Sequence, residues 1–286
     1  MLTSLAPAKI NLVLEVLSKR DDGYHETRSL IQTISLHDII SFELARGISL
    51  ECTEPSLQTS DNLVVQAAEL LRKVCGCEKG VKIGLEKRIP WGAGLGGGSS
   101  DAAATLLALE KLWELELQIS DLVGLAARLG SDVPFFIHKG TALAEGKGEK
   151  VTPLPASLPG WFILLLPPLP QIPHKTQQLY SRLDKQHFTG GQFVGKAIEA
   201  WLQNRRISPS LLFNVFDSIA FDAFPGLEDY WERFKEAGAP AIHLAGSGPA
   251  LFAPADNEAA AEELHRCLCQ QGLEAYIVST ILPQMV

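Results

Sequence analysis

The sequence contains no apolar run long enough to cross a membrane. Its longest run covers residues 161–166 and ends at two prolines, whereas a transmembrane helix needs about 18 or more apolar residues. Near the N-terminus, Lys9 and Asn11 interrupt the apolar stretch that a secretory signal peptide would require. We therefore expect a cytoplasmic protein with no membrane partner, and we interpret residues 161–166 as a buried strand.

Cysteine is scarce, and its spacing excludes the common zinc motifs. The chain has five cysteines but no C-x-x-C pair and no histidines at zinc-type spacing. We expect reduced thiols with structural roles, as is usual inside cells. These residues are Cys52, Cys75, Cys77, Cys267 and Cys269.

Positive charge is also in short supply. The chain has 25 lysines and arginines against 33 acidic residues, which gives a formal net charge of −8. A protein with this balance repels a nucleic-acid backbone, so we predict no nucleic-acid partner. Any phosphate that it binds must be held locally, in a pocket.

The chain of 286 residues is long enough for one large or two moderate domains, at about 150 residues each. Hydrophobic residues make up 46% of it, which argues against disorder as the main state. Prolines and a glycine interrupt every periodic pattern within residues 152–160. We therefore predict two domains, residues 1–155 and 156–286.

Hydrophobic periodicity predicts a mixture of strands and helices without strict alternation, which favours an α+β or mixed α/β class in both halves. The first strand has a period of two that places Lys9 and Asn11 on one face of a half-buried strand. Asp61 and Ser120 are predicted to cap helices, and Asp132 to lie at or near a third N-cap. Strands are predicted at 10–16, 28–36, 38–44, 47–52, 81–85, 161–166, 241–245, 249–253 and 274–281, and helices at 61–73, 102–113, 120–130, 174–186, 192–205, 226–237 and 256–271.

The strongest local signal is a glycine-rich segment directly before a helix. Five glycines fall within residues 92–98, where the missing β-carbons allow the backbone to wrap around an anion. The following helix adds unpaired N–H groups and the positive end of its dipole. These features predict a phosphate-binding loop made by Gly92, Gly94, Leu95, Gly96, Gly97, Gly98, Ser99 and Ser100.

The sequence of this segment excludes one known phosphate-binding loop, the Walker A loop, and argues against a second, the dinucleotide-binding loop. A Walker A loop needs a lysine after the last glycine, but Ser99 stands there. The spacing of the glycines does match the dinucleotide fingerprint, which keeps a nicotinamide-dependent oxidoreductase open as an alternative. However, about 20 residues further on the chain carries Glu114 and Glu116 at the end of a helix, not at the end of a second strand.

The loop therefore needs a cation from elsewhere in the chain. Lys9, on the polar face of the first strand, is the candidate. Transfer of a phosphoryl group to an alcohol also requires a base for the hydroxyl proton, and Asp132 is the candidate for that role.

Five segments resemble, in the same order, the motifs of the GHMP small-molecule kinases. They are residues 6–12 (APAKINL), 90–103 (PWGAGLGGGSSDAA), 130–136 (GSDVPFF), 144–149 (AEGKGE) and 245–252 (AGSGPALF). The resemblance spans nearly the whole chain. It implies an α+β, two-domain fold, with an N-terminal domain like ribosomal protein S5 domain 2, a ferredoxin-like C-terminal domain, and the active site in the cleft between them.

The resemblance also implies residue roles and cofactors. The phosphates of ATP would lie along residues 94–100, and its adenine end near Asn62 and Lys87. Asp132 would be the general base, while Lys9 would keep Asp132 ionised and neutralise charge in the transition state. Mg²⁺ is expected with ATP, and Ser100 is the one candidate ligand because the sequence contains no acidic cluster that must bind the metal.

Within the family, the motifs most resemble kinases whose small-molecule substrate carries a cytidine diphosphate. The resemblance implies that Tyr24 and His25 lie at the cytidine end, where an aromatic ring can stack on the base. Asn11 would hydrogen-bond the methylerythritol part, and Gly246 and Ser247 would also contact the substrate. Another GHMP kinase and a non-catalytic ligand sensor stay as alternatives, and the expected assembly is a monomer or a weak homodimer.

Two segments depart from the family pattern. Ala245 stands where the family usually has Ser or Thr, and Pro249 stands where a small residue with an N–H donor is common. Residues 171–180 match the family's aromatic segment poorly, so either His174 or Tyr180 could cover the cytosine.

Overall fold

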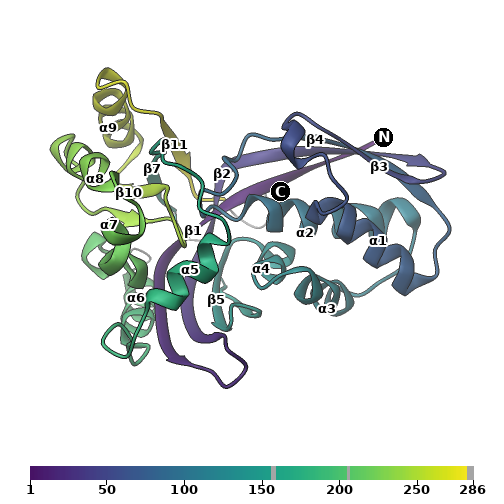
Figure 1. The fold of residues 1–286 in the computed structure, drawn as a ribbon, viewed down its shortest axis with the longest axis horizontal. Coiled ribbons are helices and arrows are strands. Elements are labelled where there is room, and N and C mark those ends of the chain that lie inside the picture. The colour runs from purple at the N-terminus through teal and green to yellow at the C-terminus, as the bar shows by residue number, and fades with distance from the viewer. Residues whose placement is uncertain (156–158, 205–206, 282–286) are drawn as a thin grey trace.

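The computed structural model describes residues 1–155, 159–204 and 207–281, which form two sheets with helices packed on them. In Figure 1 the first half of the chain, purple to teal, lies on the right, and the second half, green to yellow, lies on the left. Two long strands, β1 (Leu2–Lys19) and β2 (His25–Ala45), extend between the halves.

The larger sheet is built around the antiparallel pair of β1 and β2. Its strand order is β3-β4-β2-β1-β8, with β5 paired to β2 and β6 paired to β5. One end of β2 pairs with β5 and the other end with β4, so this strand serves two parts of the sheet. The remaining strands are β3 (Ile48–Cys52), β4 (Gly80–Glu86), β5 (Thr141–Gly146), β6 (Lys150–Pro153) and β8 (Phe213–Asn214).

The prediction of separate strands at 28–36 and 38–44 is wrong, because β2 runs through both without a break. Asp38, directly after the expected break at residue 37, is fully buried and accepts hydrogen bonds from the backbone N–H groups of Arg88 and Ile89. A polar residue that is paired in this way can stay inside a strand. The prediction overlooked β5 and β6.

The prediction that the first strand is half-buried is also wrong. Residues 6–16 are buried along their whole length. Helix α2 (Gly97–Trp113) packs near β1, and apolar side chains of Ala8, Ile10 and Leu12 join the core shared with the smaller sheet. Lys9 and Asn11 are therefore buried polar residues, and each needs a partner within the protein.

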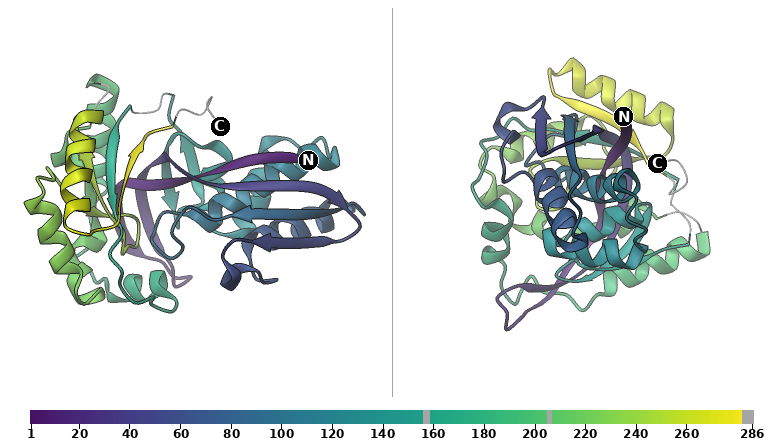
Figure 2. Two further views of the ribbon diagram at one scale, coloured as in Figure 1. Left: turned by 90° about the horizontal axis from the view of Figure 1, so that it is seen from above. Right: turned by 90° about the vertical axis from the view of Figure 1, so that its right-hand side faces the viewer.

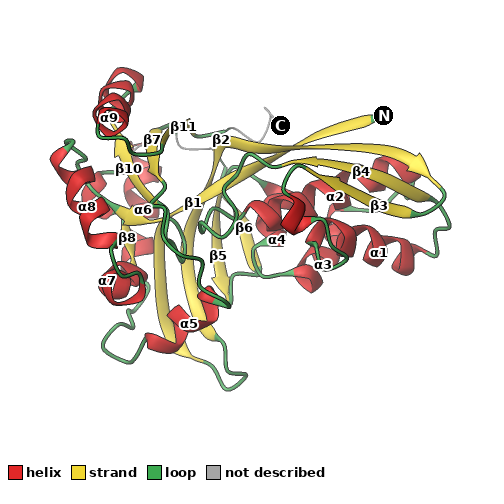
Figure 3. Cartoon of the chain, turned by 45° about the horizontal axis from the view of Figure 1, so that its top comes forward, coloured by secondary structure: helices red, strands yellow, loops and turns green. Residues whose placement is uncertain are grey.

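Helices α1 (Leu63–Cys75), α2, α3 (Ile119–Leu129) and α4 (Val133–His138) gather on one side of the larger sheet (Figure 3). Together with the sheet they enclose an apolar core that includes Phe42, Leu106 and Trp113.

Two of the predicted N-caps lie one or two residues away from the observed ones. Asn62, not Asp61, caps α1, because its side-chain oxygen accepts a hydrogen bond from the N–H of Val64. Gln118, not Ser120, caps α3 through a capping box with Asp121.

The smaller sheet has the order β11-β7-β10-β9 and is antiparallel throughout. In chain order this is 4-1-3-2, the ferredoxin-like arrangement that was expected. Helices α8 (Leu227–Glu236) and α9 (Glu258–Gln270) cover its outer face (Figure 2). Its strands are β7 (Trp161–Leu165), β9 (His243–Leu244), β10 (Leu251–Ala255) and β11 (Ala275–Ser279).

The remaining helices of the second half are α5 (Lys175–Arg182), α6 (Gln192–Asn204) and α7 (Ala220–Ala223). Three short 3₁₀ turns lie at Pro55–Leu57, Pro209–Leu211 and Val215–Ile219.

The two halves share a continuous core. Side chains of β7 alternate between the two faces of the smaller sheet: Ile163 packs toward the outer helices, whereas Phe162 and Leu164 pack toward β1 and β2. Burial on both faces explains the uninterrupted apolar run of this strand. The predicted division after residue 155 adjoins residues 156–158, which lie outside the described residues, and it stays a prediction.

All five cysteines are free thiols. Among the described residues, no helix is both long and apolar enough to span a bilayer.

Candidate active site

The glycine-rich segment has a backbone that only glycine adopts readily. Gly92, Gly94 and Gly96 have φ angles of 75°, 90° and 74°. The loop is shorter than predicted, because Gly97 already opens α2. A β-carbon on Gly94 would lie close to the carbonyl oxygen of Ala245, so this glycine also permits contact between the two halves.

Two cavities share this loop as a common wall. The first, of about 350 Å³, is lined by Lys9 and Asp132, and we call it the Lys9 cavity. The second, of about 280 Å³, is lined by Asn62 and Lys87, and we call it the Asn62 cavity. Both are lined by Gly92, Gly94, Gly96, Gly97 and Gly98. Two ligands bound in them would therefore meet along the loop.

Lys9 and Asp132 come together in the Lys9 cavity, with 3.8 Å between the Lys9 Nζ and Asp132 Oδ2 atoms. The strand that carries Lys9 is fixed to the loop by a 2.9 Å hydrogen bond from the Lys9 N–H to the Leu95 carbonyl. Burial lowers the pKa of Lys9, and the Asp132 carboxylate opposes this effect. A phosphate in the cavity would oppose it further, because a second anion favours the ammonium form.

Asp132 occupies the predicted N-cap position of α4, but its side chain makes no capping hydrogen bond. Its side chain is 44% exposed and lines the cavity. The carboxylate is therefore free to accept a proton from a ligand.

Asn11 is held in one orientation by a chain of hydrogen bonds. Its Oδ1 accepts from Lys9 Nζ at 2.6 Å, and its Nδ2 donates to Ser29 Oγ at 2.7 Å. Ser29 Oγ in turn donates to the Val13 carbonyl. One N–H of the Asn11 amide is left over for a ligand hydroxyl.

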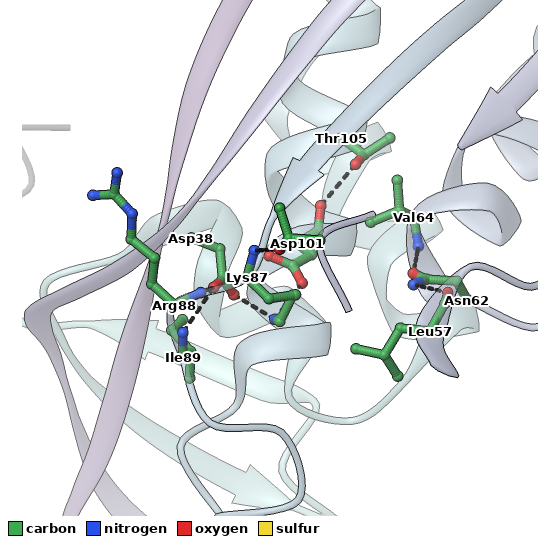
Figure 4. Close-up of polar contacts among 10 residues, drawn as sticks. Asp38, Leu57, Asn62, Val64, Lys87, Arg88, Ile89, Asp101 and Thr105 are labelled. Atoms are coloured by element: carbon green, nitrogen blue, oxygen red, sulfur yellow. Dashed lines mark hydrogen bonds and ion pairs between the residues drawn. The ribbon is translucent and has the colours of Figure 1, made fainter. Parts of the chain in front are cut away.

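In the Asn62 cavity, Lys87 is held between two carboxylates, as Figure 4 shows. Its Nζ donates to Asp38 and, at 2.9 Å, to Asp101. Burial opposes the charged form of Lys87, but Asp101 and Asp38 outweigh it and raise the lysine pKa. Burial raises the pKa of Asp101. The charge of Lys87 is thus balanced within the protein, so it adds little net positive charge for a phosphate.

Asn62 lines the same cavity, but its side-chain amide makes hydrogen bonds within the protein. Its Oδ1 caps α1, and its Nδ2 donates to the Leu57 carbonyl at 2.8 Å (Figure 4). The structure thus brings Asn62 and Lys87 to one cavity, as expected, although both have protein partners. Sequence reasoning did not single out Asp38 or Asp101, and Asp101 could have been found because it ends the SSD run of the glycine motif.

The structure separates the two residues expected at the cytidine end. Tyr24 is 55% exposed in the turn between β1 and β2, with the ammonium of Lys147 4.6 Å from its ring centre. His25 is buried and stacks on Tyr180 at 5.1 Å, and Tyr180 lines the Lys9 cavity. Burial, followed by the charge of Lys19, lowers the pKa of His25.

Of the two residues left open in the segment 171–180, Tyr180 lies in the cavity wall, whereas His174 is exposed at the N-cap of α5.

Gly246 and Ser247 line the Lys9 cavity from the second half of the chain. Their loop is held by Asn214, whose Nδ2 donates to the carbonyls of Leu244 and Gly246, both at 2.8 Å. Ser247 Oγ shares a 3.0 Å hydrogen bond with Thr176 Oγ1. The loop therefore keeps polar groups at the cavity even though Ala245 lacks a hydroxyl.

Lys175 is a cavity residue that sequence reasoning did not single out. Its Nζ donates to the Gly92 carbonyl at 2.6 Å and to the Gly248 carbonyl. Burial, followed by the charge of Lys9, lowers its pKa to about 8. No sequence signal marked it, because residues 171–180 match the family pattern poorly.

A metal would have few protein ligands here. The described part of the chain contains no group of three or more His, Cys, Asp or Glu side chains that could hold a metal ion. Mg²⁺ is often bound by one or two carboxylates together with substrate phosphates, so Asp132 beside a nucleotide fits this ion. The Ser100 hydroxyl is buried without a hydrogen-bond partner, which leaves it as a further candidate.

Two family models and several known proteins match this chain. The family model described as "GHMP kinases N terminal domain" matches residues 62–140, and "GHMP kinases C terminal" matches residues 196–273. A protein of Dehalococcoides mccartyi named 4-diphosphocytidyl-2-C-methyl-D-erythritol kinase is 47% identical over 283 residues, 99% of each chain. A protein of the same name from a Geobacillus species is 38% identical over 93% of each chain.

Solved structures show the same likeness. A crystal structure of 4-(cytidine 5'-diphospho)-2C-methyl-D-erythritol kinase is 34% identical, with a TM-score of 0.82 and coverage of 98% of this chain and 99% of that one. Homoserine kinase from Cytophaga hutchinsonii shares the fold at 20% identity, with a TM-score of 0.74 and coverage of 98% and 95%.

Proposed function

This chain belongs to the GHMP kinase family, and on that premise we propose that it transfers the terminal phosphate of ATP to the 2-hydroxyl of 4-diphosphocytidyl-2-C-methyl-D-erythritol. The product would be an intermediate of non-mevalonate isoprenoid biosynthesis. The observation that carries the proposal is the placement of Lys9 and Asp132 in one cavity, with the glycine-rich loop separating it from a second cavity.

We propose that ATP binds with its adenine end in the Asn62 cavity and its phosphates along residues 94–100. Left-handed glycines turn the loop into α2, and the first turn of that helix offers unpaired N–H groups and the positive end of its dipole. The terminal phosphate would then lie at the boundary of the Lys9 cavity.

The acceptor would place its 2-hydroxyl between that phosphate and Asp132. The carboxylate accepts the hydroxyl proton while the oxygen forms a bond to the terminal phosphorus, and the bond from that phosphorus to ADP breaks. Lys9 offsets negative charge on the transferring oxygens, and Asn11 orients the acceptor. Mg²⁺, when bound with ATP, would neutralise part of the phosphate charge.

The cytidine end would lie toward Tyr180. An aromatic wall can stack on a base, and His25 behind Tyr180 keeps that ring in place. We propose that Tyr24 and Lys147 border the entrance, where their cation–π contact joins the β1–β2 turn to the turn between β5 and β6.

The experiment is a kinase assay with the purified protein, ATP and Mg²⁺, and with this acceptor, mevalonate or homoserine in parallel. We expect a new phosphomonoester, detected by ³¹P nuclear magnetic resonance, with the cytidine-linked acceptor only. Phosphorylation of mevalonate or homoserine at an equal rate would indicate a different GHMP kinase.

A thermal-shift assay tests the alternatives outside the kinases. A rise in melting temperature with NADH but not with ATP would support an oxidoreductase. Binding of ATP and acceptor without product would support a ligand sensor. The cytoplasmic location, the monomer or weak homodimer and the absence of nucleic-acid and membrane partners stay predictions.

A further inference from the structure

The glycine-rich loop lacks the lysine that follows the last glycine of a Walker A loop. A lysine from elsewhere in the chain, Lys175, is hydrogen-bonded to it instead. Lys175 reaches the loop from the first turn of α5, 83 residues beyond Gly92 in the chain. Its ammonium donates to the Gly92 carbonyl and to the Gly248 carbonyl, and its side chain lines the Lys9 cavity.

The charge of Lys175 is less balanced than that of the other buried lysines of the two cavities. Lys87 is paired with two carboxylates, and Lys9 lies 3.8 Å from Asp132. Lys175 has backbone carbonyls as its hydrogen-bond partners among the described residues, and the charge that acts on its pKa is that of Lys9. Three lysines, Lys9, Lys147 and Lys175, therefore line this cavity with one carboxylate, that of Asp132, in a chain whose net charge is negative.

The donor geometry of Lys175 leaves capacity for a ligand. An ammonium has three N–H donors and no acceptor. Two of the three are used by carbonyls, which hold the nitrogen in place. The third is available for an acceptor in the cavity.

The position of Lys175 in its helix also points to an anion. It is the first residue of α5, where the positive end of the helix dipole disfavours a cation. Burial and the neighbouring Lys9 add to this cost. The negative charge of an anionic ligand would offset the helix dipole, the burial and the repulsion from Lys9, which all disfavour the ammonium form of Lys175.

We propose that Lys175 supplies the cation that the glycine-rich loop lacks and binds phosphate oxygens in the Lys9 cavity. This inference rests on the proposed function, because the phosphate belongs either to the terminal position of ATP or to the diphosphate of the acceptor. Lys175 is thus a substrate-binding residue contributed by the second half of the chain to the loop of the first.

The test is calorimetric binding to wild type, Lys175→Met and Lys175→Arg, with ADP, a non-hydrolysable ATP analogue and the acceptor titrated separately. The Met variant keeps an unbranched side chain of similar length but removes its charge. We expect its dissociation constant to rise roughly 10- to 100-fold for one ligand class, the usual effect of losing a charged hydrogen bond. The Arg variant should recover most of the loss.

The ligand that is affected identifies the phosphate. Weaker binding of the ATP analogue with unchanged ADP binding indicates the terminal phosphate, and weaker binding of the acceptor alone indicates its diphosphate. Unchanged affinities for all three ligands would overturn the proposal. Equal weakening of all three would also overturn it, because that result indicates a latch between two loops and no phosphate contact.

Proton uptake gives a second readout that a purely structural role would not change. At a pH of about 8, a phosphate next to Lys175 should raise its pKa and draw a proton from the buffer. Lys9, Asp132 and Lys147 line the same cavity and also contribute to proton uptake. The measurement is therefore the difference in proton uptake between wild type and the Met variant. Titrations in two buffers of different ionisation enthalpy should show smaller uptake in the variant.

Two controls separate this inference from the proposed function. Lys185→Met, which changes an exposed lysine a few residues further along, should bind all ligands like the wild type. If wild type itself neither binds the ligands nor forms product, the proposed function fails. If wild type does both and the Met variant matches it, only the role of Lys175 fails.

Discussion

At the scale of single residues, the site depends on polar groups that are buried with a specific partner. Lys9, Asn11 and Ser29 form one hydrogen-bonded chain, so the orientation of each is set by the next. Asp132 is different, because its side chain is not used for capping and is open to the cavity. A carboxylate without a structural task can change protonation during a reaction cycle at little cost to the fold.

The two tyrosines near the proposed cytidine end differ in their surroundings, and this difference predicts unequal effects on acceptor binding. Tyr180 lines the Lys9 cavity, whereas Tyr24 is largely exposed. We expect Tyr180→Leu to raise KM for the acceptor by roughly tenfold or more, the loss of one stacking contact, and Tyr24→Leu to have a smaller effect. Steady-state kinetics with varied acceptor should show this order, and the reverse order would place the base beside Tyr24.

The lowered pKa of Lys175 predicts a pH dependence of stability without ligand. Its pKa falls from 10.5 to about 8 on folding, so between these values the folded protein binds fewer protons than the unfolded chain. The contribution of this residue to the free energy of unfolding therefore rises with pH across that window, by about 1 to 3 kcal/mol.

Urea unfolding of wild type and Lys175→Met at about pH 7.5 and pH 9.5 measures this contribution. The difference in unfolding free energy, wild type minus variant, should be larger at the higher pH. The carbonyls left without a donor in the variant do not titrate, so their loss cancels from the comparison. A difference that does not change with pH would mean that the lysine is not desolvated.

At the scale of elements, the glycines of the loop differ in whether they can accept a side chain. Gly94 has a φ of 90°, and a β-carbon there would clash with the Ala245 carbonyl oxygen. Gly98 lies within α2, and its β-carbon would be 3.7 Å from Leu63, an ordinary contact.

These two glycines form a matched pair of alanine variants. We expect Gly94→Ala to lower the free energy of unfolding by about 2 to 4 kcal/mol, because it combines backbone strain with a clash against backbone. Gly98→Ala should match the wild type or exceed it by up to about 1 kcal/mol, because alanine favours a helix. Denaturant titration decides between them, and equal stabilities would mean that the loop is not held against the second half.

The same elements show how far the sequence predicts the fold and where prediction ends. The apolar run at 161–166 and the helical periodicity at 102–113 mark β7 and α2, because burial leaves a direct pattern in the residue types. The prediction fails at residue 37, where polar residues suggest a break in the strand. The strand continues there, and the neighbouring Asp38 can be buried because distant N–H groups satisfy it.

For the site, the sequence motifs predict Lys9, Asp132 and the glycine-rich loop. The motifs do not predict Lys175. Its contact with Gly92 joins two halves of the chain, and such a long-range contact leaves no local pattern in the sequence.

At the scale of the whole molecule, the proposed function requires a negatively charged protein to bind two anionic ligands. The formal net charge of −8 does not prevent this, because positive groups are concentrated in the Lys9 cavity. Lys9 and Lys175 come from opposite halves of the chain, so the cavity exists only when the halves are packed together. The site and the shared core are therefore coupled.

This coupling predicts a single unfolding transition. Phe252 is fully buried and packs on Phe162 in the core between the sheets. We expect Phe252→Ala to lower the free energy of unfolding by about 3 to 5 kcal/mol and to shift the transition as one step.

Circular dichroism and tryptophan fluorescence should report the same midpoint for wild type and for this variant. Phe221→Ala is the control, because Phe221 is 42% exposed and should cost much less. Two separate transitions would show that the halves fold independently.

In the proposed reaction, Asp132 takes the proton of the acceptor hydroxyl across the loop from the bound nucleotide. Rapid-quench single-turnover kinetics of wild type and Asp132→Asn, with ATP, Mg²⁺ and the cytidine-linked acceptor, test it most directly. Asp222→Asn, at an exposed position, is the control for loss of a negative charge. We expect Asp132→Asn to lower the transfer rate by roughly 10² or more while the dissociation constant for ATP stays within a few-fold of wild type. A transfer rate equal to that of the wild type would contradict it.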